Sequence, residues 1–591
     1  MASSASPTFD ASLASSVADV RTKVGFDKKF LLATGLVLLL HLLLSLWFYQ
    51  LFLTRAQLVT KVIEHFAGIE LPVFALYSDA VFHQWSILLS ASMQPLFAVA
   101  VLLTASLPFI FRRELRWAEF DATGRLKVAI TVLSVVLTWQ LVTYDYNLFL
   151  DQAHYVDRAL VLCLALLVWK HPGFVPLLLV AALTMLSSIR YPFEWLSITD
   201  RRLLIDTLIL FTSCCAIRVG IGRGWIPRPV RLKPLTLFLF LLLCLIGASY
   251  FATAVKKIWI SPYGWDWFWE GKLGLHTAFC VSRGWLTVLS AEQRMEVVRW
   301  VTAVQVPFLF AALLIEIGGL FTVVRRRLSM WLLLSMISLH LGIFAVSGIL
   351  FWKWIAVDIV AIGLLYRLTS AESAEIFQGR RMVAVAIILI SPFCFRPVML
   401  GWFDTPLHNH LQLEAVGESG EVYTIDKGAM DPYDMFFQFN RFVFLVDQPL
   451  MVVGHSVRDY DVAESILNAG PDGVEQLCQE QGINHFDAEK CRVFDQFIGT
   501  YFANLNRYGG KPLTFGPASP FHHIYGWSHG QKFIGQEPVR SVRVRFIQEY
   551  YDGEQNVPLF NEIVRDVPIE PQPAGDQQAV EVEPNLLSHL Q

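Results

Sequence analysis

Long apolar runs recur along the first 400 residues of this chain, and they constrain its fold more than any other feature of the sequence. A run of about 18 residues is long enough to cross the hydrocarbon core of a membrane as a helix. The chain is 54% hydrophobic and 16% charged, whereas soluble domains carry about 25% charged residues. The sequence therefore predicts an α-helical polytopic membrane protein whose main partner is the lipid bilayer.

The runs predict about eleven transmembrane helices. The fourth and fifth are short and are joined by "KHPG", so that together they could form one tight helical hairpin. The expected helices cover 30–53, 87–111, 127–144, 157–170, 174–190, 203–221, 235–255, 300–323, 329–349, 351–367 and 382–400.

Lysine and arginine near the helix ends predict the orientation, because cytoplasmic loops are enriched in both. Basic residues concentrate in alternate loops, which contain among others Arg113, Arg223, Arg326 and Arg381. The N-terminus is then cytoplasmic, and an odd number of helices places the C-terminal region outside. This pattern suits a bacterial inner membrane with a periplasmic domain, and an endoplasmic reticulum membrane with a luminal domain suits it equally well.

Four regions are predicted. Residues 1–29 form a cytoplasmic segment without a cleaved signal peptide, and 30–400 form the membrane domain. Residues 401–565 form an extracytoplasmic α+β domain, with strands in "LQLEAVGESGEVYTID", "RFVFLV" and "SVRVRFIQEY" and a glycine-terminated helix in "DVAESILNAGPDGVEQLCQEQG". Residues 566–591 are rich in proline, glutamine and acidic residues, which indicates disorder.

Cysteines and charge narrow the function only slightly. Cys478 and Cys491 lie in the predicted outer domain, where an oxidising compartment would allow a disulfide between them, although two free cysteines fit the sequence as well. The net charge of −3 gives no indication of nucleic-acid binding. Motifs of ATPases, serine hydrolases and thiol oxidoreductases were not found.

The stretch "YFATAVKKIWISPYGWDWFWEG" at 250–271 places Lys256 and Lys257 at the outer end of an apolar run. It resembles the segment of vitamin K-dependent gamma-carboxylases in which "AGVKKL" precedes Trp, Glu and Gly. Three further pieces follow in the family's order: "VSRGWLTVLS", "LLIEIGGLFTVV" and "SLHLGIFAVSGILFWKW". The chain is thus similar, over residues 100–370, to the HTTM membrane domain of which the carboxylases are one branch.

The resemblance implies a reaction and a cofactor. The family deprotonates a reduced quinone, vitamin K hydroquinone, adds oxygen, and uses the strong base that results to remove a glutamate γ-proton before CO2 adds. The first step needs a base far weaker than free lysine, whose pKa is about 10.4, and desolvation shifts an amine in that direction. The family's base matches Lys257, whereas lysines at a helix end also commonly extend to the lipid head groups.

Further candidates surround this lysine. Lys256, Trp267, Trp269, Glu316 and His340 are predicted to bind the cofactor, and the tryptophans could equally be interfacial anchors. Glu316 and His340 lie inside consecutive apolar runs, where ionisable groups need a partner, and they are expected to pair with each other.

His154 resembles the catalytic-site histidine of the family's "WNNHSYLYGLL" segment, which makes it the second predicted catalytic residue. The residues before it are Asp151, Gln152 and Ala153 instead of Trp-Asn-Asn. Because asparagine amides could orient CO2 or an oxyanion, this departure tells against carboxylation of the usual kind.

No metal is predicted. His408 and His410 would lie on one face of a strand, and His522 and His523 are adjacent, but no third ligand accompanies either pair.

Three functions remain open. The first is a quinol-using membrane enzyme of the carboxylase (carbon–carbon lyase) type that acts on an exported peptide or small substrate. The second is an HTTM protein that matures or handles an exported peptide without carboxylation. The third is a scaffold or transporter without chemistry.

Overall fold

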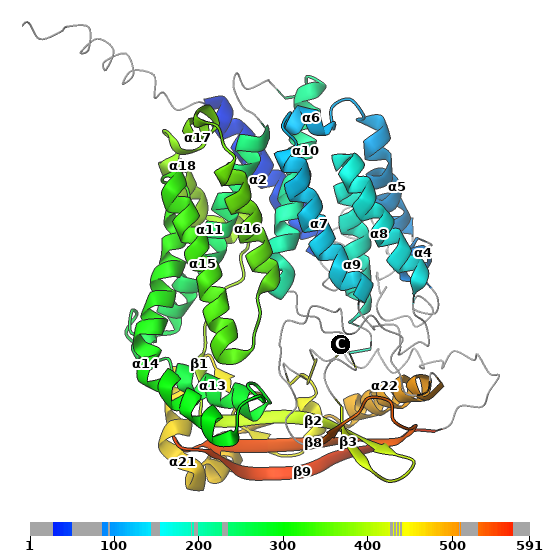
Figure 1. Ribbon diagram of the computed structural model, residues 1–591, viewed down its shortest axis with the longest axis vertical. Helices are drawn as coiled ribbons and strands as arrows, with labels where there is room; N and C mark the ends of the chain where they lie inside the picture. Colours follow the sequence, from blue (N-terminus) through cyan, green and yellow to red (C-terminus); the bar gives the residue numbers. More distant parts are fainter. Residues whose placement is uncertain are drawn as a thin grey trace, which may run out of the picture.

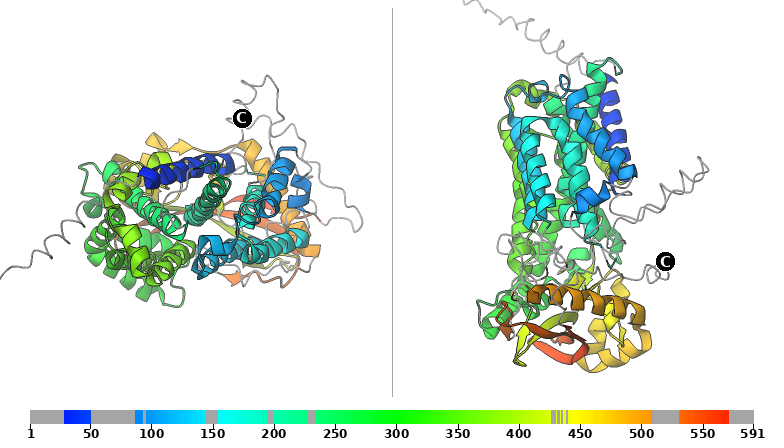
Figure 2. Two further views of the ribbon diagram at one scale, coloured as in Figure 1. Left: turned by 90° about the horizontal axis from the view of Figure 1, so that it is seen from above. Right: turned by 90° about the vertical axis from the view of Figure 1, so that its right-hand side faces the viewer.

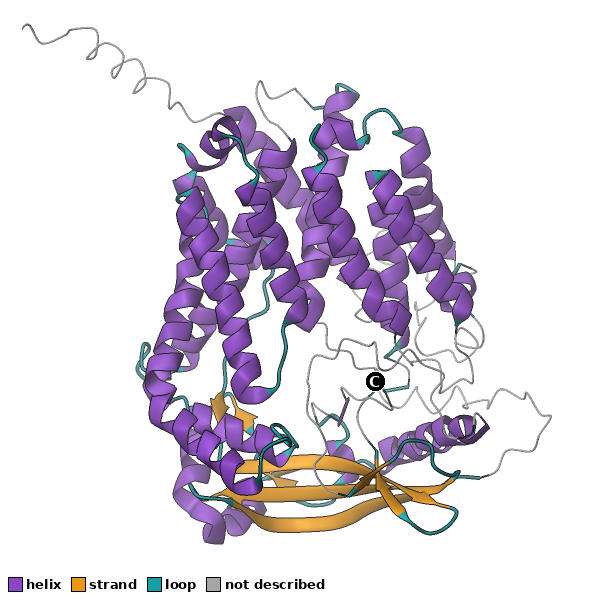
Figure 3. Ribbon diagram, viewed as in Figure 1, coloured by secondary structure: helices purple, strands orange, loops and turns teal. Residues whose placement is uncertain are grey.

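The computed structural model has two layers, a tall helical bundle and a sheet domain that covers one end of it (Figure 1, Figure 3). The side view in Figure 2 shows the same arrangement, with the sheet and its two long helices beneath the bundle. The structure describes residues 28–49, 86–92, 95–143, 154–190, 192–193, 199–226, 234–425, 430, 433, 436–437, 440–507, 509 and 530–570. Most of the predicted N-terminal segment, most of the predicted tail, and His522 and His523 lie outside these residues.

The bundle consists of helices at every place where an apolar run predicts one. They are α2 (Lys28–Phe48), α4 (Ile87–Ala91), α5 (Pro95–Ile110), α6 (Trp117–Phe120), α7 (Arg125–Thr143), α8 (Tyr155–Lys170), α9 (Val175–Ser188), α10 (Arg202–Gly222), α11 (Pro234–Ile260), α12 (Trp267–Glu270), α13 (Leu273–Ser282), α14 (Ala291–Gly318), α15 (Arg326–Ser347), α16 (Trp352–Tyr366), α17 (Ser370–Phe377), α18 (Arg381–Leu389) and α19 (Ser391–Cys394), with 3-10 turns η4 (Pro172–Phe174), η5 (Thr199–Arg201) and η6 (Gly319–Phe321).

Six of the described helical segments are long and apolar enough to cross a membrane, fewer than the eleven that the sequence predicts. These six are Lys28–Phe48, Arg125–Thr143, Thr199–Gly222, Pro234–Ile260, Ala291–Phe321 and Arg326–Ser347. The predicted span at 382–400 is instead the two short helices α18 and α19, because Pro392 at the start of α19 lacks a backbone N–H. The predicted hairpin of the fourth and fifth spans is present as α8, η4 and α9.

Helix α14 begins nine residues before the predicted start at residue 300. A capping box explains the earlier start: Gln293 N donates to Ser290 Oγ at 3.2 Å, and Ser290 N donates to Gln293 Oε1 at 3.0 Å. The first turns are polar, so apolar periodicity alone could not locate this end.

The helices differ in how much apolar surface they leave uncovered. In their most apolar stretches, 94% of the residues of α11 are buried, but only 28% in α14 and 22% in α15. The large hydrophobic side chains exposed on these two outer helices include Trp300, Phe308, Phe310, Leu314, Trp331, Leu334 and Leu341. Exposed apolar surface of this extent marks contact with a lipid or protein environment.

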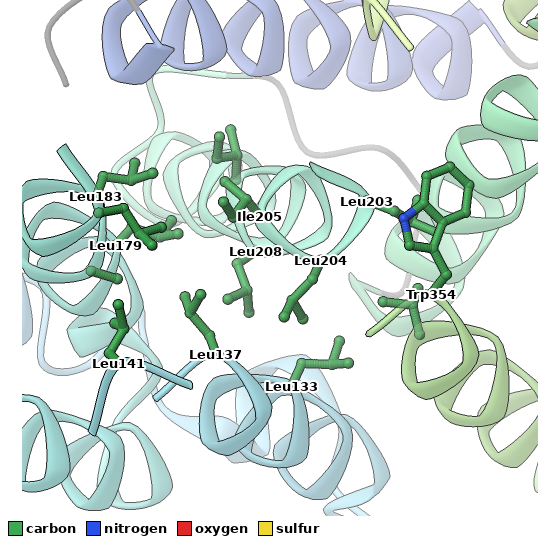
Figure 4. Packing of buried hydrophobic residues seen from close by; sticks show 14 of the residues in the cluster. Leu133, Leu137, Leu141, Leu179, Leu183, Leu203, Leu204, Ile205, Leu208 and Trp354 are labelled. Atoms are coloured by element: carbon green, nitrogen blue, oxygen red, sulfur yellow. The ribbon is translucent and has the colours of Figure 1, made fainter. Parts of the chain in front are cut away.

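Rows of leucines hold the centre of the bundle together (Figure 4). Leu133, Leu137 and Leu141 recur every four residues on α7, so they lie on one face of that helix. In Figure 4 they point toward Leu204 and Leu208 of α10 and toward the leucines of α9. This packing fixes α7, α9 and α10 as one unit.

Basic side chains tie the helix ends together at the end of the bundle opposite the sheet, where Figure 1 shows α6 and α17. Arg125 of α7 donates to both carboxylate oxygens of Glu372 in α17, at 2.9 and 3.0 Å. Arg326 donates to the carbonyl of Tyr366 at 2.7 Å. The arginine-rich loops therefore meet at one end.

The sheet domain is built on a five-stranded sheet with the order β7-β3-β2-β8-β9. Its strands are β2 (Leu407–Gly417), β3 (Val422–Thr424), β7 (Gln531–Lys532), β8 (Val539–Tyr551) and β9 (Asn556–Pro568). All neighbours are antiparallel except β3 and β7. Two small ladders pair β1 (Phe403–Asp404) with β5 (Ser456–Val457) and β4 (Pro449–Leu450) with β6 (Ile483–Asn484).

Sequence predictions for this domain are correct in part. The hairpin β2–β3, strand β8 and the helical segment α21 (Tyr460–Gln481), which ends at Gly482, are confirmed. The segment α21 is two helices joined by a kink at Gly470, where φ is 65°. "RFVFLV" forms a 3-10 turn, η8 (Val443–Leu445), instead of a strand. Helix α22 (Ala488–Arg507) and strand β9 were not predicted, and β9 extends into the predicted tail as far as Pro568.

Cys478 and Cys491 are both free thiols in the structure, so the predicted disulfide between them is not present. Cys478 of α21 packs in one hydrophobic cluster and Cys491 of α22 in another. The Cys491 Sγ lies 3.5 Å from the carbonyl oxygen of Phe444. The chain turns between the two helices and orients the thiols into separate cores.

Candidate functional site

Lys257 lies in the last turn of α11 and forms an ion pair with Glu316 of α14. The Nζ atom is 2.6 Å from Oε1, and the two side chains are 12% and 7% exposed. The expected pairing of Glu316 with His340 is therefore wrong. Helices α11 and α14 pack together, and this packing brings the Glu316 carboxylate beside Lys257 instead of His340.

Trp267 of α12 covers the ammonium of Lys257. Its ring centroid lies 4.4 Å from Nζ, which is a cation–π contact. The indole N–H donates to the carbonyl of Trp402 at 3.2 Å, and the ring packs with Leu309 and Phe403 in a small hydrophobic cluster. The segment that enters the sheet domain thus forms part of the wall around Lys257.

Lys256 and Trp269 occupy different surroundings. A Cβ atom on Gly401 would lie 3.1 Å from Cγ of Lys256 and 3.4 Å from the backbone nitrogen of Lys257, so the chain crosses the lysine pair closely there. Trp269 is 56% exposed and its ring contacts Phe268. Trp269 is therefore an exposed aromatic at the rim and not a residue of the buried site.

His340 belongs to a second polar cluster two turns deeper in the bundle. The hydroxyl of Tyr250 lies 2.7 Å from Nε2 of His340 and donates to Oδ2 of Asp358 at 2.9 Å. The rings of Phe351 and Trp354 lie 4.9 and 5.7 Å from the His340 ring. Three helices, α11, α15 and α16, meet at this cluster.

The two clusters are adjacent on α11, since Tyr250 precedes Lys257 by seven residues, about two helical turns, and so lies on the same face. Glu316 Oε2 and Asp358 Oδ1 are buried and have no hydrogen-bond partner among the described residues. Each cluster therefore holds a carboxylate oxygen that can still accept a hydrogen bond or a proton.

His154, the second predicted catalytic residue, lies elsewhere. It precedes α8 in a left-handed backbone conformation, with φ 45° and ψ 46°, which non-glycine residues rarely adopt. Its Nδ1 is 2.9 Å from Oδ2 of Asp157, a carboxylate that also accepts hydrogen bonds from Ser86 and Ile87. Figure 1 shows α8 and α11 in different parts of the bundle, so His154 and Lys257 do not form one centre.

The motif "VSRGWLTVLS" packs against the helix that carries His340. Trp285 Nε1 donates to the carbonyl of Ala345 at 3.2 Å, and its ring contacts Phe344. Arg283 is buried beside the ring of Phe279. The ordered motifs therefore come together around α11, α14 and α15.

A group of side chains that the sequence analysis missed lies where α13 meets the sheet domain. His276 Nδ1 is 2.9 Å from His455 Nε2 and 3.3 Å from Asp404 Oδ1, and His455 Nε2 is 3.4 Å from the same oxygen. Residues so far apart in sequence gave no spacing signal. His408 and His410, which were considered instead, are both buried in β2 and are not among these three.

The histidines here are strongly affected by their surroundings. Burial lowers the pKa of His455 well below its usual value and that of His408 to about 3, and interaction with His276 acts in the same direction. Burial opposes a charge on His276 as well, but its interactions with Cys280 and Asp404 outweigh burial and raise its pKa. His408 and His455 are therefore neutral at pH 7.

A cavity of about 490 Å³ opens beside α13. Residues of α13, α14, α21 and the β8–β9 turn line it, among them Lys272, Arg299, Gln305 and Tyr551. Lys272 and Arg299 contribute two cationic side chains to the lining and Asp552 contributes one carboxylate.

A scan against protein-family models found no match for this chain, and searches of the curated proteins and of the solved structures found none either.

Proposed function

We propose that the protein is an integral membrane enzyme in which Lys257 and Glu316 exchange a proton with a reduced quinone, and that it modifies an exported peptide or small substrate. The observation that carries the proposal is the buried 2.6 Å ion pair between Lys257 and Glu316 beside the ring of Trp267. An ionisable pair inside apolar helices is costly, so it is normally retained for a function.

The proposed orientation places the sheet domain outside the cytoplasm. The arginine-rich loops meet at the end of the bundle away from the sheet, as cytoplasmic loops of a membrane protein do. The exposed apolar side chains of α14 and α15 would face lipid. A bacterial inner membrane suits this arrangement, and Lys257 then lies near the outer surface.

The residues around Lys257 fit a quinone ring. Trp267, Leu309 and Phe403 supply an apolar wall, while Lys257 Nζ and the unpartnered Glu316 Oε2 supply polar atoms. A flat apolar ring with oxygen substituents needs this combination. When bound, a reduced quinone would supply acidic hydroxyl groups and reducing electrons.

The ion pair explains how a lysine could act as a base here. The carboxylate stabilises the ammonium form, so Lys257 is not the isolated, desolvated base expected from the sequence. Burial penalises both charges of the pair, and this penalty falls when the proton moves from Nζ to Oε1. The amine left on Lys257 can then accept a proton from a ligand, while Glu316 holds the first proton.

Tyr250, His340 and Asp358 continue this path into the bundle. The Tyr250 hydroxyl lies within hydrogen-bond distance of both His340 Nε2 and Asp358 Oδ2, and Tyr250 lies about two helical turns from Lys257 on the same face of α11. A proton leaving Glu316 would be accepted here. These three residues act by positioning and relaying protons and not by touching substrate.

Carboxylation is the specific reaction that the resemblance of 250–271 to the gamma-carboxylases favours. In the cavity beside α13, Lys272 and Arg299 would pair with an acidic side chain of an exported peptide. The departure at Asp151–Ala153 supports the alternative, an HTTM protein that handles such a peptide without carboxylating it. Mass spectrometry of exported peptides from cells with and without the protein separates the two, since carboxylation adds CO2.

The central experiment compares Lys257→Ala, Glu316→Gln and Lys256→Ala in the same membranes, with quinol oxidation as the readout. Removing a general base lowers turnover by about 10²–10⁴-fold, so we expect this loss for Lys257→Ala and Glu316→Gln. Lys256→Ala is the matched control and retains most activity. Equal, small effects of all three variants would contradict the proposal and leave the lysines as membrane anchors of a scaffold or transporter.

A further inference from the structure

We propose that His276, Asp404 and His455 bind a divalent transition-metal ion, with zinc as the best fit, at the junction between helix α13 and the sheet domain. This site is separate from the Lys257–Glu316 pair and does not depend on the proposed quinol chemistry. Each residue directs one ligand atom to the same point, and the three atoms are 2.9, 3.3 and 3.4 Å apart.

These separations are those of atoms that share a metal ion. Zinc binds imidazole nitrogen and carboxylate oxygen at about 2.0–2.2 Å. Two ligands of a tetrahedral ion at that distance lie about 3.3 Å apart, and adjacent ligands of an octahedral ion lie about 2.9 Å apart. Over bond lengths of about 2.0–2.2 Å these separations run from about 2.8 to about 3.6 Å, and all three sides of the triangle formed by His276, Asp404 and His455, 2.9, 3.3 and 3.4 Å, fall within that range.

Hydrogen bonding alone leaves the group incomplete. A contact between the two ring nitrogens uses one proton, and Asp404 Oδ1, although buried and 3.3 and 3.4 Å from those nitrogens, has no hydrogen bond of good geometry among the described residues. An unpaired buried carboxylate oxygen is costly. A metal ion would satisfy both nitrogens and the oxygen at once.

The backbone holds the ligands in place. Strands β1 and β5 pair Asp404 with Ser456, the residue after His455, and Thr405 N donates to the carbonyl of His455 at 2.8 Å. The ring of Phe279 stacks on His455 with a centroid distance of 3.8 Å. Two ligands are therefore positioned by one small ladder, and His276 approaches from α13.

A neighbouring residue also orients His276. The Cys280 Sγ, one helical turn later on α13, lies 3.8 Å from Nε2 of His276, the ring nitrogen that does not face the metal position. A partner at the second nitrogen fixes the tautomer and orientation of a ligating imidazole. Cys280 is thus assigned to the outer shell of the site.

Two imidazoles and one carboxylate are the ligand set of zinc sites that retain an open coordination position, and of some iron(II) sites. The side chains of Asp404 and His455 are 13% and 18% exposed, so water could reach the ion. Gly274 and Leu275, the two residues before His276, line the 490 Å³ cavity.

The test uses the purified full-length protein in detergent, stripped with a chelator and then titrated with Zn²⁺ alone. Bound metal is measured by plasma mass spectrometry, and Co²⁺ substitution gives a visible absorption spectrum that reports the ligand geometry. We expect about one zinc per chain for the wild type and for the control His485→Gln, which changes a histidine of the same domain outside the site.

Asp404→Asn and His455→Gln should each weaken zinc binding by at least about tenfold and remove the Co²⁺ spectrum, while Cys280→Ser should weaken it by about tenfold through the outer shell. Size-exclusion profiles identify any variant that fails to fold, and Cys280→Ser then keeps the test decisive. Failure of the wild type to bind more zinc than Asp404→Asn would overturn the proposal. Retention of quinol oxidation by the metal-free protein would separate this site from the Lys257 site.

Discussion

Lys257 Nζ lies 2.6 Å from Glu316 Oε1, although the two residues are 59 positions apart in the chain. The pair joins the last turn of α11 to α14 and sits under Trp267, whose indole is hydrogen-bonded to the segment that enters the sheet domain. The pair thus connects α11 with α14, two helices long and apolar enough to cross a membrane. Through Trp267 it also contacts the segment that leads into the sheet domain. This connection makes the pair important for stability as well as for the proposed chemistry.

Replacing only Glu316 should lower the free energy of unfolding more than replacing Lys257 and Glu316 together. Glu316→Leu leaves a buried ammonium without its carboxylate, and we expect a loss of about 3–5 kcal/mol. The double variant Lys257→Met with Glu316→Leu should recover much of that loss. Thermal unfolding of the wild type, Lys257→Met, Glu316→Leu and the double variant in one detergent measures the coupling, and strictly additive effects would show that the contact contributes nothing.

Gly247 should not tolerate a side chain. Helix α11 and turn η6 approach so closely that a Cβ on Gly247 would lie 2.3 Å from the carbonyl oxygen of Gly319. Gly247→Ala should therefore cost about 1–3 kcal/mol through forced separation of the backbones. Gly342→Ala on α15 is the control, since nothing lies within 4 Å of its Cβ position, and it should stabilise the helix by up to about 1 kcal/mol. Unfolding temperatures of the two variants compare these effects.

The stability that Arg125 contributes through its ion pairs with Glu372 and Asp121, at the end of the bundle opposite the sheet, should depend on pH. Hydrogen bonds from Arg125 lower the pKa of Glu372 to about 2. Burial acts to raise the pKa of Asp121, but hydrogen bonds from Arg125 and Thr123 lower it to about 2. Both native values lie below the ordinary ones of 4.5 and 3.8, so this stability is complete above about pH 5 and is lost as the pH falls toward 2.

Glu372→Gln should remove about 1.5–3 kcal/mol at pH 7 and flatten the fall in unfolding temperature between pH 5 and pH 3. Glu464→Gln, an exposed change on α21, should leave the profile as in the wild type. A Glu372→Gln profile with the full acid dependence would contradict the assignment.

Cys478 and Cys491 should both be alkylated without any reducing agent. Burial raises the pKa of each thiol, so alkylation of the folded protein should be slow and should become complete in denaturant. Peptide mapping after denaturation measures both sites, and a linked peptide containing the two cysteines would contradict the structure.

The orientation can be tested with a reporter that is active only in the cytoplasm. Fused after residue 570, beyond the end of β9, the reporter should be silent, because the arginine-rich loops meet at the other end of the bundle. Inserted between Gly222, the end of α10, and Pro234, the start of α11, it should be active. The reverse pattern would place Lys257 on the cytoplasmic side.

Local features of the sequence predicted local elements well. The apolar runs predicted helices in the right places, the glycine at 482 predicted the end of α21, and alternation predicted β2 and β8. Local features predicted helix lengths less well. The first turns of α14 are polar and show no apolar period, and Pro392 divides the last apolar run into two short helices. Strand β9 was not predicted, because exposed and covered residues do not alternate along it and its last three residues fall in the expected tail.

The sequence by itself determined that this chain forms long apolar helices followed by a mixed α and β domain, because hydrophobicity and its period act through near neighbours along the chain. It also pointed to Lys257, Glu316 and His340 as ionisable groups that need partners. Only the tertiary structure decided that Glu316 binds Lys257 and that His340 binds Tyr250. Likewise, His276 meets His455 across 179 positions. Such pairings depend on how distant elements pack against one another, and no local pattern of residues encodes that packing.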